Sequence, residues 1–274
     1  MPHETAAALA REILDAYAAP HAIDTPPSGR PGGLSLDEAY AVEAEVVSLR
    51  AQAGHAPVGV KVGYASKAVW RALKLETVVW AHMYDDTVEH TTGGTTTLDV
   101  SGMYAPKIEP EIVFKLRKPI EGGSDAAAIL ASVDWLALGF EIIDCVFPDW
   151  KLQPVDFVAS RGLHTRLIVG TPMTVTPENI PALADVLPSF GVTLLRDSQT
   201  VAEGSGRNCL RSPALCLGEL ASAMAARGVP PLDAGALISS GTLTESQLLG
   251  ADQTWAATVT GLDLPTLTVQ TVRG

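Results

Sequence analysis

Two glutamates two residues apart, Glu109 and Glu111, stand in the stretch 106–114 immediately before an apolar run. Residues two apart on a β-strand point to the same face, so the two carboxylates would share one face of the strand. A bound divalent cation relieves the repulsion between two such acids, because hard cations such as Mg2+ prefer carboxylate oxygens. A surface strand with solvated charges is the other interpretation of this stretch.

Two more charged residues stand inside apolar segments. Glu141 lies within the apolar run 136–143, and Lys61 is surrounded by valine and glycine in 58–63. An unpaired charge is costly to bury, so each of them needs a partner. A common polar pocket shared with Glu109 and Glu111 is one interpretation. A buried structural ion pair between Lys61 and Glu141 is the other, and the residues alone leave both open.

The elements that must position these side chains are read from apolar periodicity and from Gly, Pro and capping signals. Residues 91–97 are predicted to form a turn around two glycines. Helices are expected at 3–19, 35–53, 66–73, 124–133 with Ser124 as the cap, 212–228, and briefly within 149–160. Strands are expected at 58–65, 78–84, 108–116, 135–143, 166–169, 190–196, 199–203, 236–239, 255–260 and 267–272.

The first two helices form a separate unit in this interpretation. Pro20 stops the first of them, and Ser35 with Glu38 has the spacing of a capping box that opens the second. We therefore expect an N-terminal helical segment over 1–56, followed by a strand-rich catalytic domain over 57–274.

Composition excludes several classes of protein. The formal net charge of -12 argues against a nucleic-acid binder, which needs a basic surface. No apolar run approaches the ~18 residues of a membrane span, and no opening segment resembles a signal peptide. The odd cysteine count, Cys145, Cys209 and Cys216, without CxxC spacing, predicts reduced and buried thiols in a cytoplasmic protein.

Five segments in fixed order carry a resemblance to a known family. They are 61–67, 106–114, 140–144, 204–208 and 239–242, and the likeness runs from about residue 34 to the C-terminus. Together they resemble the fumarylacetoacetate hydrolase superfamily, in particular its 2-oxopent-4-enoate (vinylpyruvate) hydratases and 4-oxalocrotonate decarboxylases. The resemblance implies an α+β fold, a mixed β-sandwich or roll with surrounding helices and the N-terminal helical segment.

The resemblance also implies a metal site. Carried over residue by residue, Glu109, Glu111 and Glu141 bind Mg2+ or Mn2+. A small 2-oxo acid substrate would chelate this metal through its carboxylate and keto oxygens, and the metal would act as a Lewis acid. Lys61 matches the pocket lysine of the family, whose ammonium can hydrogen-bond a metal ligand or the bound oxyanion.

Two further positions match family segments. Asp86 follows the second expected strand and is a candidate for proton transfer, with an ordinary turn residue as the alternative. Ser240, Gly241 and Thr242 match a loop that can bind the substrate carboxylate through N–H and hydroxyl groups, with an ordinary turn as the alternative.

The chain departs from the family pattern at the distal end of the expected pocket. An Asp-Asn-Ala-Ser-like run of the relatives is replaced by 160–163, and their Val-Leu-Gly by 209–211. Arg161 would pair with a second substrate carboxylate or be a solvated surface charge. His164 would be an acid/base residue or a structural histidine. Trp150 would line the pocket rim or belong to the core.

The resemblance implies a metal-dependent lyase, a hydratase of 2-hydroxypenta-2,4-dienoate or a close relative. Decarboxylation, tautomerisation and acylpyruvate C–C hydrolysis remain possible on the same scaffold. Hydrolysis ranks lower because it needs a histidine base, for which His82 and His164 are the mid-chain candidates. A non-catalytic partner subunit is an alternative from another class. Self-association into a homo-oligomer, and a complex with a pathway decarboxylase or hydratase, are expected by analogy.

Overall fold

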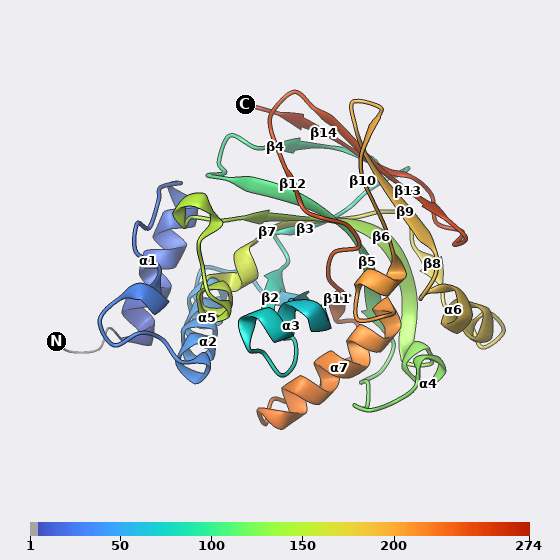
Figure 1. The fold of residues 1–274 in the computed structure, drawn as a ribbon, viewed down its shortest axis with the longest axis horizontal. Coiled ribbons are helices and arrows are strands. Elements are labelled where there is room, and N and C mark those ends of the chain that lie inside the picture. The colour runs from blue at the N-terminus through green and yellow to red at the C-terminus, as the bar shows by residue number, and fades with distance from the viewer. Residues whose placement is uncertain (1–4) are drawn as a thin grey trace.

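The computed structural model describes residues 5–274, in which the strands form two curved sheets (Figure 1). The larger sheet has the order β2-β1-β11-β5-β6-β7-β3, with β12 added to β5 and β8 to β6. Its strands are β1 (Pro57–Gly63), β2 (Val79–Tyr84), β3 (Val88–His90), β5 (Pro106–Leu116), β6 (Val133–Asp144), β7 (His164–Val169), β8 (Met173–Thr174), β11 (Leu237–Ser239) and β12 (Gln247–Leu248).

The second sheet has the order β10-β9-β13-β14-β4 and lies against the larger one. Its strands are β4 (Thr95–Asp99), β9 (Gly191–Arg196), β10 (Gln199–Ser205), β13 (Thr254–Thr260) and β14 (Leu267–Val272). The predicted turn at 91–97 is therefore partly wrong, because Thr95 begins β4, which pairs in parallel with β14. This pairing joins segments more than 150 residues apart, so no local pattern indicates it.

Helices cover the sheets on several sides (Figure 1). They are α1 (Ala6–Ala18), α2 (Leu36–Gln52), α3 (Lys67–Leu73), α4 (Ala126–Leu130), α5 (Pro154–Ala159), α6 (Ile180–Val186) and α7 (Pro213–Ala226). Short 3-10 turns lie at Pro27–Gly29, Pro148–Trp150, Arg161–Leu163 and Gly206–Asn208. The mixed α+β roll that the sequence predicts is confirmed.

Strands β5 and β6 form the centre of the molecule. They pair along 11 register positions and are buried on both faces for most of their length. Phe114 and Phe140 are fully buried within the main apolar cluster, which also contains Trp255 of the second sheet. Burial of this kind stabilises a fold by about 25 cal/mol per Å2 of apolar surface. The strand pair therefore gives a rigid support for any side chain that it carries.

The N-terminal helices pack on the same body rather than standing apart from it. Ile13 of α1 and Val46 of α2 share an apolar cluster with Val79 of β2 and with Phe157 of α5. The predicted capping box is confirmed: the Ser35 hydroxyl accepts from the Glu38 N–H, and the Glu38 carboxylate accepts from the Ser35 N–H. Residues 3 and 4 of the first expected helix lie outside the described residues.

One predicted cap is displaced. Helix α4 is shorter than the expected 124–133, and Asp125 rather than Ser124 caps it by accepting from the Ala128 N–H at 2.8 Å. The Ser124 hydroxyl instead donates to the Glu121 carbonyl. Asp and Ser are about equally good caps, and here the turn at Glu121 engages the Ser124 hydroxyl and leaves Asp125 as the cap.

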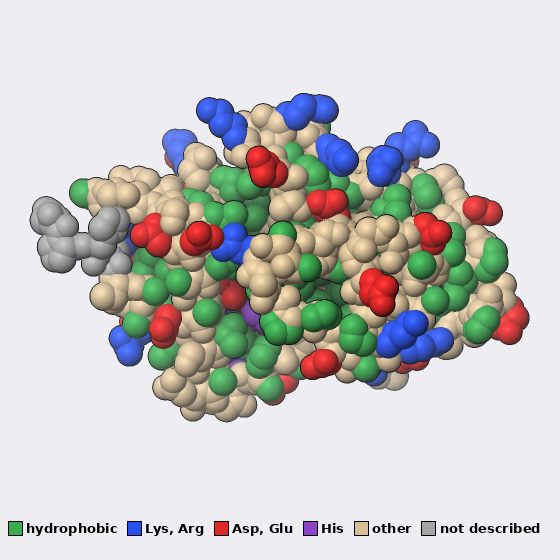
Figure 2. Space-filling view, turned by 90° about the horizontal axis from the view of Figure 1, so that it is seen from below, with side chains coloured by type: hydrophobic (Ala, Val, Ile, Leu, Met, Phe, Trp, Pro, Cys, Tyr) green, Lys and Arg blue, Asp and Glu red, His purple; other side chains and the backbone are tan. Residues whose placement is uncertain are grey.

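The structure also bears on the expectations about the cysteines, about membrane spans and about surface charge. Cys145, Cys209 and Cys216 are free and buried, as predicted. No helix within residues 5–274 combines the length and the apolar character that crossing a bilayer requires. On the face seen in Figure 2, acidic side chains are spread over the surface, while Lys and Arg lie mainly along its upper edge. That face carries no continuous basic surface.

Candidate metal centre and its cavity

Glu109, Glu111 and Glu141 come together on the central strand pair. In the antiparallel register of β5 and β6, Glu109 lies directly opposite Glu141, and Glu111 lies two residues further along β5. Each residue offers a carboxylate oxygen, and these atoms lie within 4.8 Å of one another. The two-residue spacing thus places both acids of β5 on one face, and the pairing supplies the third acid.

The negative charges of the three carboxylates favour the binding of a cation. Burial and the neighbouring Glu141 raise the pKa of Glu109 to about 7, although Lys61 opposes the shift. The pKa of Glu111 is raised well above its usual range, by burial and by the two other carboxylates. Charged carboxylates at this spacing repel strongly where water is excluded. One lysine does not balance three of them.

Lys61 of β1 is the lysine in question. Its ammonium nitrogen lies 2.8 Å from Glu141 Oε2, and both side chains are buried. Burial alone would lower the pKa of Lys61, but the charges of the three glutamates outweigh it and raise the pKa. Conversely, Lys61 and His164 outweigh the effect of burial on Glu141 and lower its pKa. Lys61 forms the ion pair with Glu141 and also lines a cavity, so both interpretations of the sequence describe part of its surroundings.

The donor set fits a hard divalent cation. Three carboxylates converge on one point, and hard cations such as Mg2+ and Mn2+ take oxygen ligands of this kind. Glu141 Oε2 is buried, and despite its closeness to the Lys61 ammonium it accepts no well-directed hydrogen bond within residues 5–274. The Lys61 ammonium at 2.8 Å is the cation that meets this oxygen, and it leaves the charges of Glu109 and Glu111 without a cation of their own.

The end of β11 and the loop that follows it hold Glu111 in place. The Ser239 hydroxyl donates to Glu111 Oε2 at 2.5 Å, and the Gly241 N–H donates to the same oxygen at 2.9 Å. Gly241 has φ +107°, and a Cβ there would lie 2.7 Å from the Ala65 Cβ, so the position requires glycine.

The sequence predicts that Ser240, Gly241 and Thr242 bind the substrate carboxylate. In the structure, their donors form hydrogen bonds within the protein. The Ser240 N–H donates to the Ile112 carbonyl, and Ser240 does not line the cavity. Gly241 and Thr242 do line it, but the Gly241 N–H is taken by Glu111 and the Thr242 hydroxyl donates to the Thr244 carbonyl. Only by breaking these bonds would the loop offer its donors to a ligand.

His164 lies directly behind Glu141. Its Nδ1 is 3.1 Å from Glu141 Oε1, and its Nε2 is 2.9 Å from the Thr87 hydroxyl. Burial lowers the pKa of His164 in spite of Glu141, which keeps the imidazole neutral near pH 7. The ring does not line the cavity, so its position corresponds to the structural alternative rather than to the acid/base one.

Arg161 is neither solvated nor in the cavity. The residue is 7% exposed, and its guanidinium lies 4.5 Å above the Tyr17 ring and donates to the His164 carbonyl. Its burial is at odds with a solvated surface charge, and its position outside the cavity gives no support to a contact with a second substrate carboxylate. Arg161 has φ +58°, a left-handed backbone conformation, and its side chain lies against Tyr17 of α1.

Asp86 lies in the turn after β2, outside the cavity. It forms an ion pair with Arg50 of α2, and its Oδ2 is 3.5 Å from His55 Nδ1. The predicted role in proton transfer at the metal centre thus has no support from its position. With Asp85 and His55 it forms a second acidic group, but Arg50 already supplies positive charge there.

The cluster of three glutamates opens into a cavity of about 520 Å3. Lys61 and Glu111, which are 2% and 1% exposed, mark its inner part, and the exposed Glu245 marks its mouth. The wall between them is largely apolar, and Lys107 and Trp150 also line it. Trp150 is therefore a cavity-lining residue, which corresponds to the first of the two places weighed for it. Its apolar lining residues include Val69, Ile143, Leu152, Phe157 and Leu163.

Sequence reasoning missed several residues that support the centre. Ser239 and Thr87 bond Glu111 and His164 from other strands or turns, and Phe157 places its ring 5.0 Å from the Lys61 ammonium. Gly162 packs against Lys61, since a Cβ there would lie 2.9 Å from the Lys61 Cδ. The segment in which this chain departs from the family pattern therefore packs against the lysine of the site.

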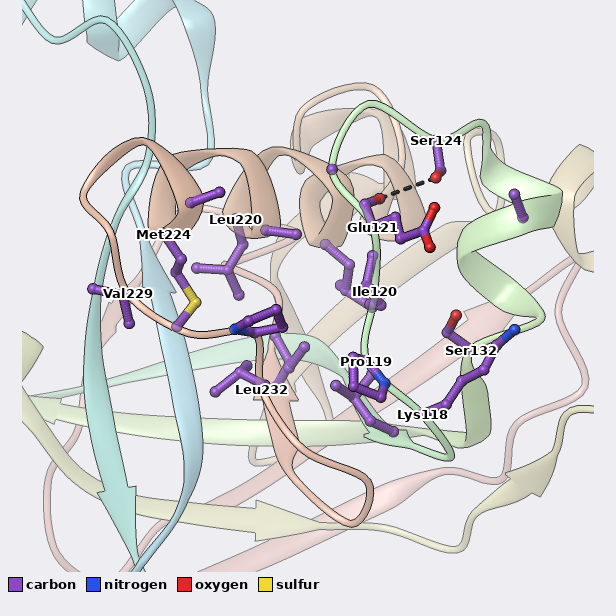
Figure 3. A pocket seen from close by; sticks show the side chains of 18 residues that line it. Lys118, Pro119, Ile120, Glu121, Ser124, Ser132, Leu220, Met224, Val229 and Leu232 are labelled. Carbon is purple, nitrogen blue, oxygen red and sulfur yellow. Dashed lines mark hydrogen bonds between the residues drawn. The ribbon is translucent and has the colours of Figure 1, made fainter.

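A larger cavity of about 710 Å3 lies elsewhere, between α7 and the segment after β5 (Figure 3). Its lining is mainly apolar, with Leu220 and Met224 of α7 facing Ile120. Lys118 and Glu121 are its charged lining residues. Size alone does not identify a reactive site, and the smaller cavity is the one that holds the converging carboxylates.

His82, the other histidine weighed as a base, lies away from the metal centre and gives a pH prediction. Its Nδ1 is 2.7 Å from Glu43 Oε1 on α2. Burial alone would lower the pKa of His82, but Glu43 outweighs it and raises the pKa above 6.5. The stability contributed by this pair is therefore fully present below the unfolded pKa and is lost as pH rises through the folded one.

We expect the free energy of unfolding of the wild type to fall by about 1 kcal/mol more than that of His82→Gln between pH 6 and pH 9. Urea titrations of both proteins at each pH measure the difference. Glutamine keeps a polar side chain at this position but does not titrate. Two curves that stay parallel across this range would contradict the assignment.

The comparisons with known proteins agree with the fold. No protein-family model matches the chain. It is 30% identical over 238 residues to a 4-oxalocrotonate decarboxylase of Pseudomonas sp. strain CF600, with 86% of each chain covered. It is 30% identical over 211 residues to a 2-keto-4-pentenoate hydratase of Paraburkholderia xenovorans, with 77% of this chain and 75% of that protein covered.

Solved structures extend the likeness over the whole fold. A 4-oxalocrotonate decarboxylase from Pseudomonas putida G7, complexed with magnesium and adipate, matches with a TM-score of 0.87 at 25% identity, covering 99% of both chains. A fumarylpyruvate hydrolase from Pseudomonas aeruginosa shares the fold, with a TM-score of 0.60 over 78% of this chain and 89% of that one. The chain therefore belongs to the family of the 2-keto-4-pentenoate hydratases and 4-oxalocrotonate decarboxylases.

Proposed function

We propose that this protein is a metal-dependent lyase acting on a 2-hydroxy-2,4-dienoate or its 2-oxo-4-enoate tautomer, in the manner of a 2-keto-4-pentenoate hydratase. The convergence of Glu109, Glu111 and Glu141 beside Lys61, at the inner part of an apolar cavity, carries this proposal. Relatives named as hydratases and as decarboxylases support the lyase class. The substrate is accordingly a small organic acid.

The three glutamates would hold Mg2+ or Mn2+, and the magnesium in the solved decarboxylase relative supports a divalent ion. Such an ion supplies Lewis-acid stabilisation of negative charge on a chelated 2-oxo acid. Lys61 adds a fixed positive charge next to Glu141, where it can hydrogen-bond an anionic substrate oxygen. The apolar wall, including Phe157 and Leu163, covers the hydrocarbon part of the substrate and excludes water around it.

His164 is proposed to act through Glu141 rather than on the substrate. It fixes Glu141 Oε1 from behind while Thr87 fixes its other nitrogen, which leaves Glu141 Oε2 facing Lys61 and the centre. Such supporting contacts orient the ligands of a metal site. Neither His82 nor His164 lines the cavity, so C–C hydrolysis with a histidine base remains the weaker alternative.

Ultraviolet absorbance with a panel of 2-hydroxydienoates tests the function. With Mg2+ present we expect the dienol absorbance to disappear and a hydrated 2-oxo acid to form. Chelation of the metal should reduce the rate at least ~1000-fold, because the ion carries most of the charge stabilisation. Turnover that is unchanged after chelation would contradict the proposal.

Product analysis separates the alternatives within the family. Release of carbon dioxide from a 4-oxalocrotonate-type substrate would indicate a decarboxylase, and a shifted double bond without hydration a tautomerase. Metal binding without turnover of any substrate would favour a non-catalytic partner subunit. Self-association, and a complex with a pathway decarboxylase or hydratase, stay predictions of the resemblance.

A further inference from the structure

Two of the three cysteines, Cys209 and Cys216, meet at a single backbone carbonyl. The Cys209 thiol donates to the Ser240 carbonyl oxygen at 2.9 Å, and the Cys216 thiol donates to the same oxygen at 3.0 Å. Both cysteines are fully buried, and both are free. The structure therefore brings two soft sulfur atoms and one oxygen atom to the same point in the interior. We call the two side chains the Cys209–Cys216 dithiol.

The backbone between the two cysteines folds them together. Leu210 and Arg211 have φ +44° and +72°, so the chain turns after Cys209, and α7 then begins with Cys216 in its first turn. Ser212 connects the two cysteines through the main chain, because its N–H donates to the Cys209 carbonyl and its carbonyl accepts from the Cys216 N–H. The positions of the two sulfur atoms are therefore set by a turn and by the start of a helix.

Two buried hydroxyl groups belong to the residues that hold the dithiol. Ser212 Oγ and Ser240 Oγ find no hydrogen-bond partner within residues 5–274, although both residues are fully buried. Buried side-chain polar atoms usually have at least one partner. Ser212 is bonded to both cysteines through its backbone, and the Ser240 carbonyl accepts from both thiols. A hydroxyl oxygen carries two lone pairs, so these two side chains have unused capacity to contact a cation.

The charges near the dithiol also favour a cation. The pKa of the Cys216 thiol is raised well above its usual range by its hydrogen bond with Cys209, by burial, and by the carboxylates of Glu111 and Glu219. A thiol with a raised pKa reacts slowly with an oxidant, because the thiolate is the nucleophile. A divalent cation that takes the place of two thiol protons leaves the total charge of the buried site unchanged. Metal binding is therefore favoured over oxidation here.

The dithiol lies just behind the wall of the 520 Å3 cavity. Gly241 lines this cavity, and a Cβ at Gly241 would lie 3.8 Å from Cys209 Sγ. Asn208, which precedes Cys209, lines the same cavity. An ion that enters the cavity is therefore separated from the sulfur atoms by a single layer of backbone.

We propose that Cys209 and Cys216, with the Ser240 carbonyl, form a second metal site that takes one thiophilic divalent cation such as Zn2+ or Cd2+. Zn2+ takes thiolate ligands, whereas Mg2+ prefers carboxylates, so the site differs in chemistry from the three glutamates. A serine hydroxyl completes the four ligands that Zn2+ usually has. The family pattern has valine in place of Cys209, and valine offers no metal ligand. The site is thus a property of this chain, and it is independent of the proposed function.

Titration with Cd2+ tests the site, because a cadmium–thiolate bond gives an ultraviolet charge-transfer absorption that a cadmium–carboxylate bond lacks. In the reduced, full-length protein this absorption should saturate at one ion per chain. Calorimetry in two buffers of different ionisation enthalpy should show that each bound ion releases about two protons, one from each thiol. A large excess of Mg2+ should leave the absorption unchanged, since Mg2+ does not compete for thiolates.

Three single variants identify the ligands. Cys209→Val and Cys216→Ala should each weaken Cd2+ binding at least ~100-fold, because the remaining thiolate loses the gain that a linked second ligand provides. Cys145→Ser is the matched control: Cys145 is also buried and free, but its thiol donates to the Phe147 carbonyl. This variant should bind Cd2+ as tightly as the wild type. Thermal unfolding without metal shows whether each variant is folded.

The measurement on the wild type decides even if a variant does not fold. A wild type that shows no thiolate absorption with Cd2+ overturns the site, and so does an absorption that persists in Cys209→Val or Cys216→Ala. An absorption that Mg2+ removes would place the ion at the glutamates and would also overturn it. An absorption lost only in Cys145→Ser would place the ion at Cys145, with the same consequence. All of these outcomes leave the proposed function intact, because its test is metal-dependent turnover.

Discussion

Glu109→Ala is expected to abolish divalent-cation binding and turnover together. Glu109 is the cleanest of the three glutamates to remove, because within residues 5–274 it forms no hydrogen bond or ion pair that supports the fold. Removing one of three carboxylate ligands should weaken Mg2+ binding at least ~100-fold and reduce kcat/KM at least ~1000-fold.

Two measurements made side by side check this result. Calorimetry gives the Mg2+ affinity, and thermal unfolding with and without Mg2+ shows whether the metal still stabilises the protein. The metal-free variant should unfold at or above the wild-type temperature, since one of three repelling carboxylates is gone. Glu203→Ala, an exposed acid on β10 of the other sheet, is the control. Full turnover by a metal-stripped Glu109→Ala protein would contradict the assignment.

Lys61→Met is expected to have the second largest effect, and it affects stability and catalysis separately. Without metal, the variant leaves Glu141 buried without its cation, which should reduce the free energy of unfolding by about 3–5 kcal/mol. Added Mg2+ should restore most of this loss, because it supplies positive charge to the same carboxylates. The Mg2+-induced rise in unfolding temperature should therefore be larger in the variant than in the wild type.

The activity of the Mg2+-loaded variant then decides between the two roles of Lys61. If the ammonium stabilises an anionic substrate oxygen, kcat should stay at least ~100-fold below the wild type although the fold is restored. A variant that regains full kcat with Mg2+ would show that Lys61 is only a structural ion-pair partner of Glu141. Lys67→Met on α3 provides a control for the loss of a lysine, since Lys67 is exposed and does not line the cavity.

The two ends of the cavity differ in the side chains that line and support them. The metal end is supported by polar contacts from several elements, including Ser239 on β11 and His164 on β7. The distal end is mostly apolar, and the Lys107 ammonium lies there against the Trp150 ring.

Much of the fold was predictable because it is encoded locally. The apolar runs of β5 and β6 and the capping box of α2 are patterns within short windows, and the structure confirms them. β4 and the cap of α4 were not predicted correctly. β4 depends on pairing with the distant β14, and Ser124 and Asp125 are both adequate caps whose choice depends on the neighbouring turn.

The positions of side chains in turns were the least predictable part of the site. Arg161 is 3 residues from His164, which contacts Glu141, yet its guanidinium lies over the ring of Tyr17, which is 144 residues away in the sequence. Asp86 follows a strand as its family motif suggests, but the turn directs it to Arg50. From the sequence, the Ser240 N–H was a candidate donor to an anion. In the structure it donates to the Ile112 carbonyl instead.

By itself, the sequence determined that two acids share one face of a strand, since the period of a β-strand is two and needs no partner. It also determined that Glu141 and Lys61, set in apolar runs, need partners. Only the tertiary structure decided that Glu141 lies opposite Glu109, because the register of β5 on β6 arises from packing across the sheet. The tertiary structure also placed Lys107 beside Trp150, and it placed Arg161 against Tyr17 and Asp86 against Arg50, outside the cavity. These three residues lie in or near turns or pack against them, and residue type alone does not fix the conformation of a turn.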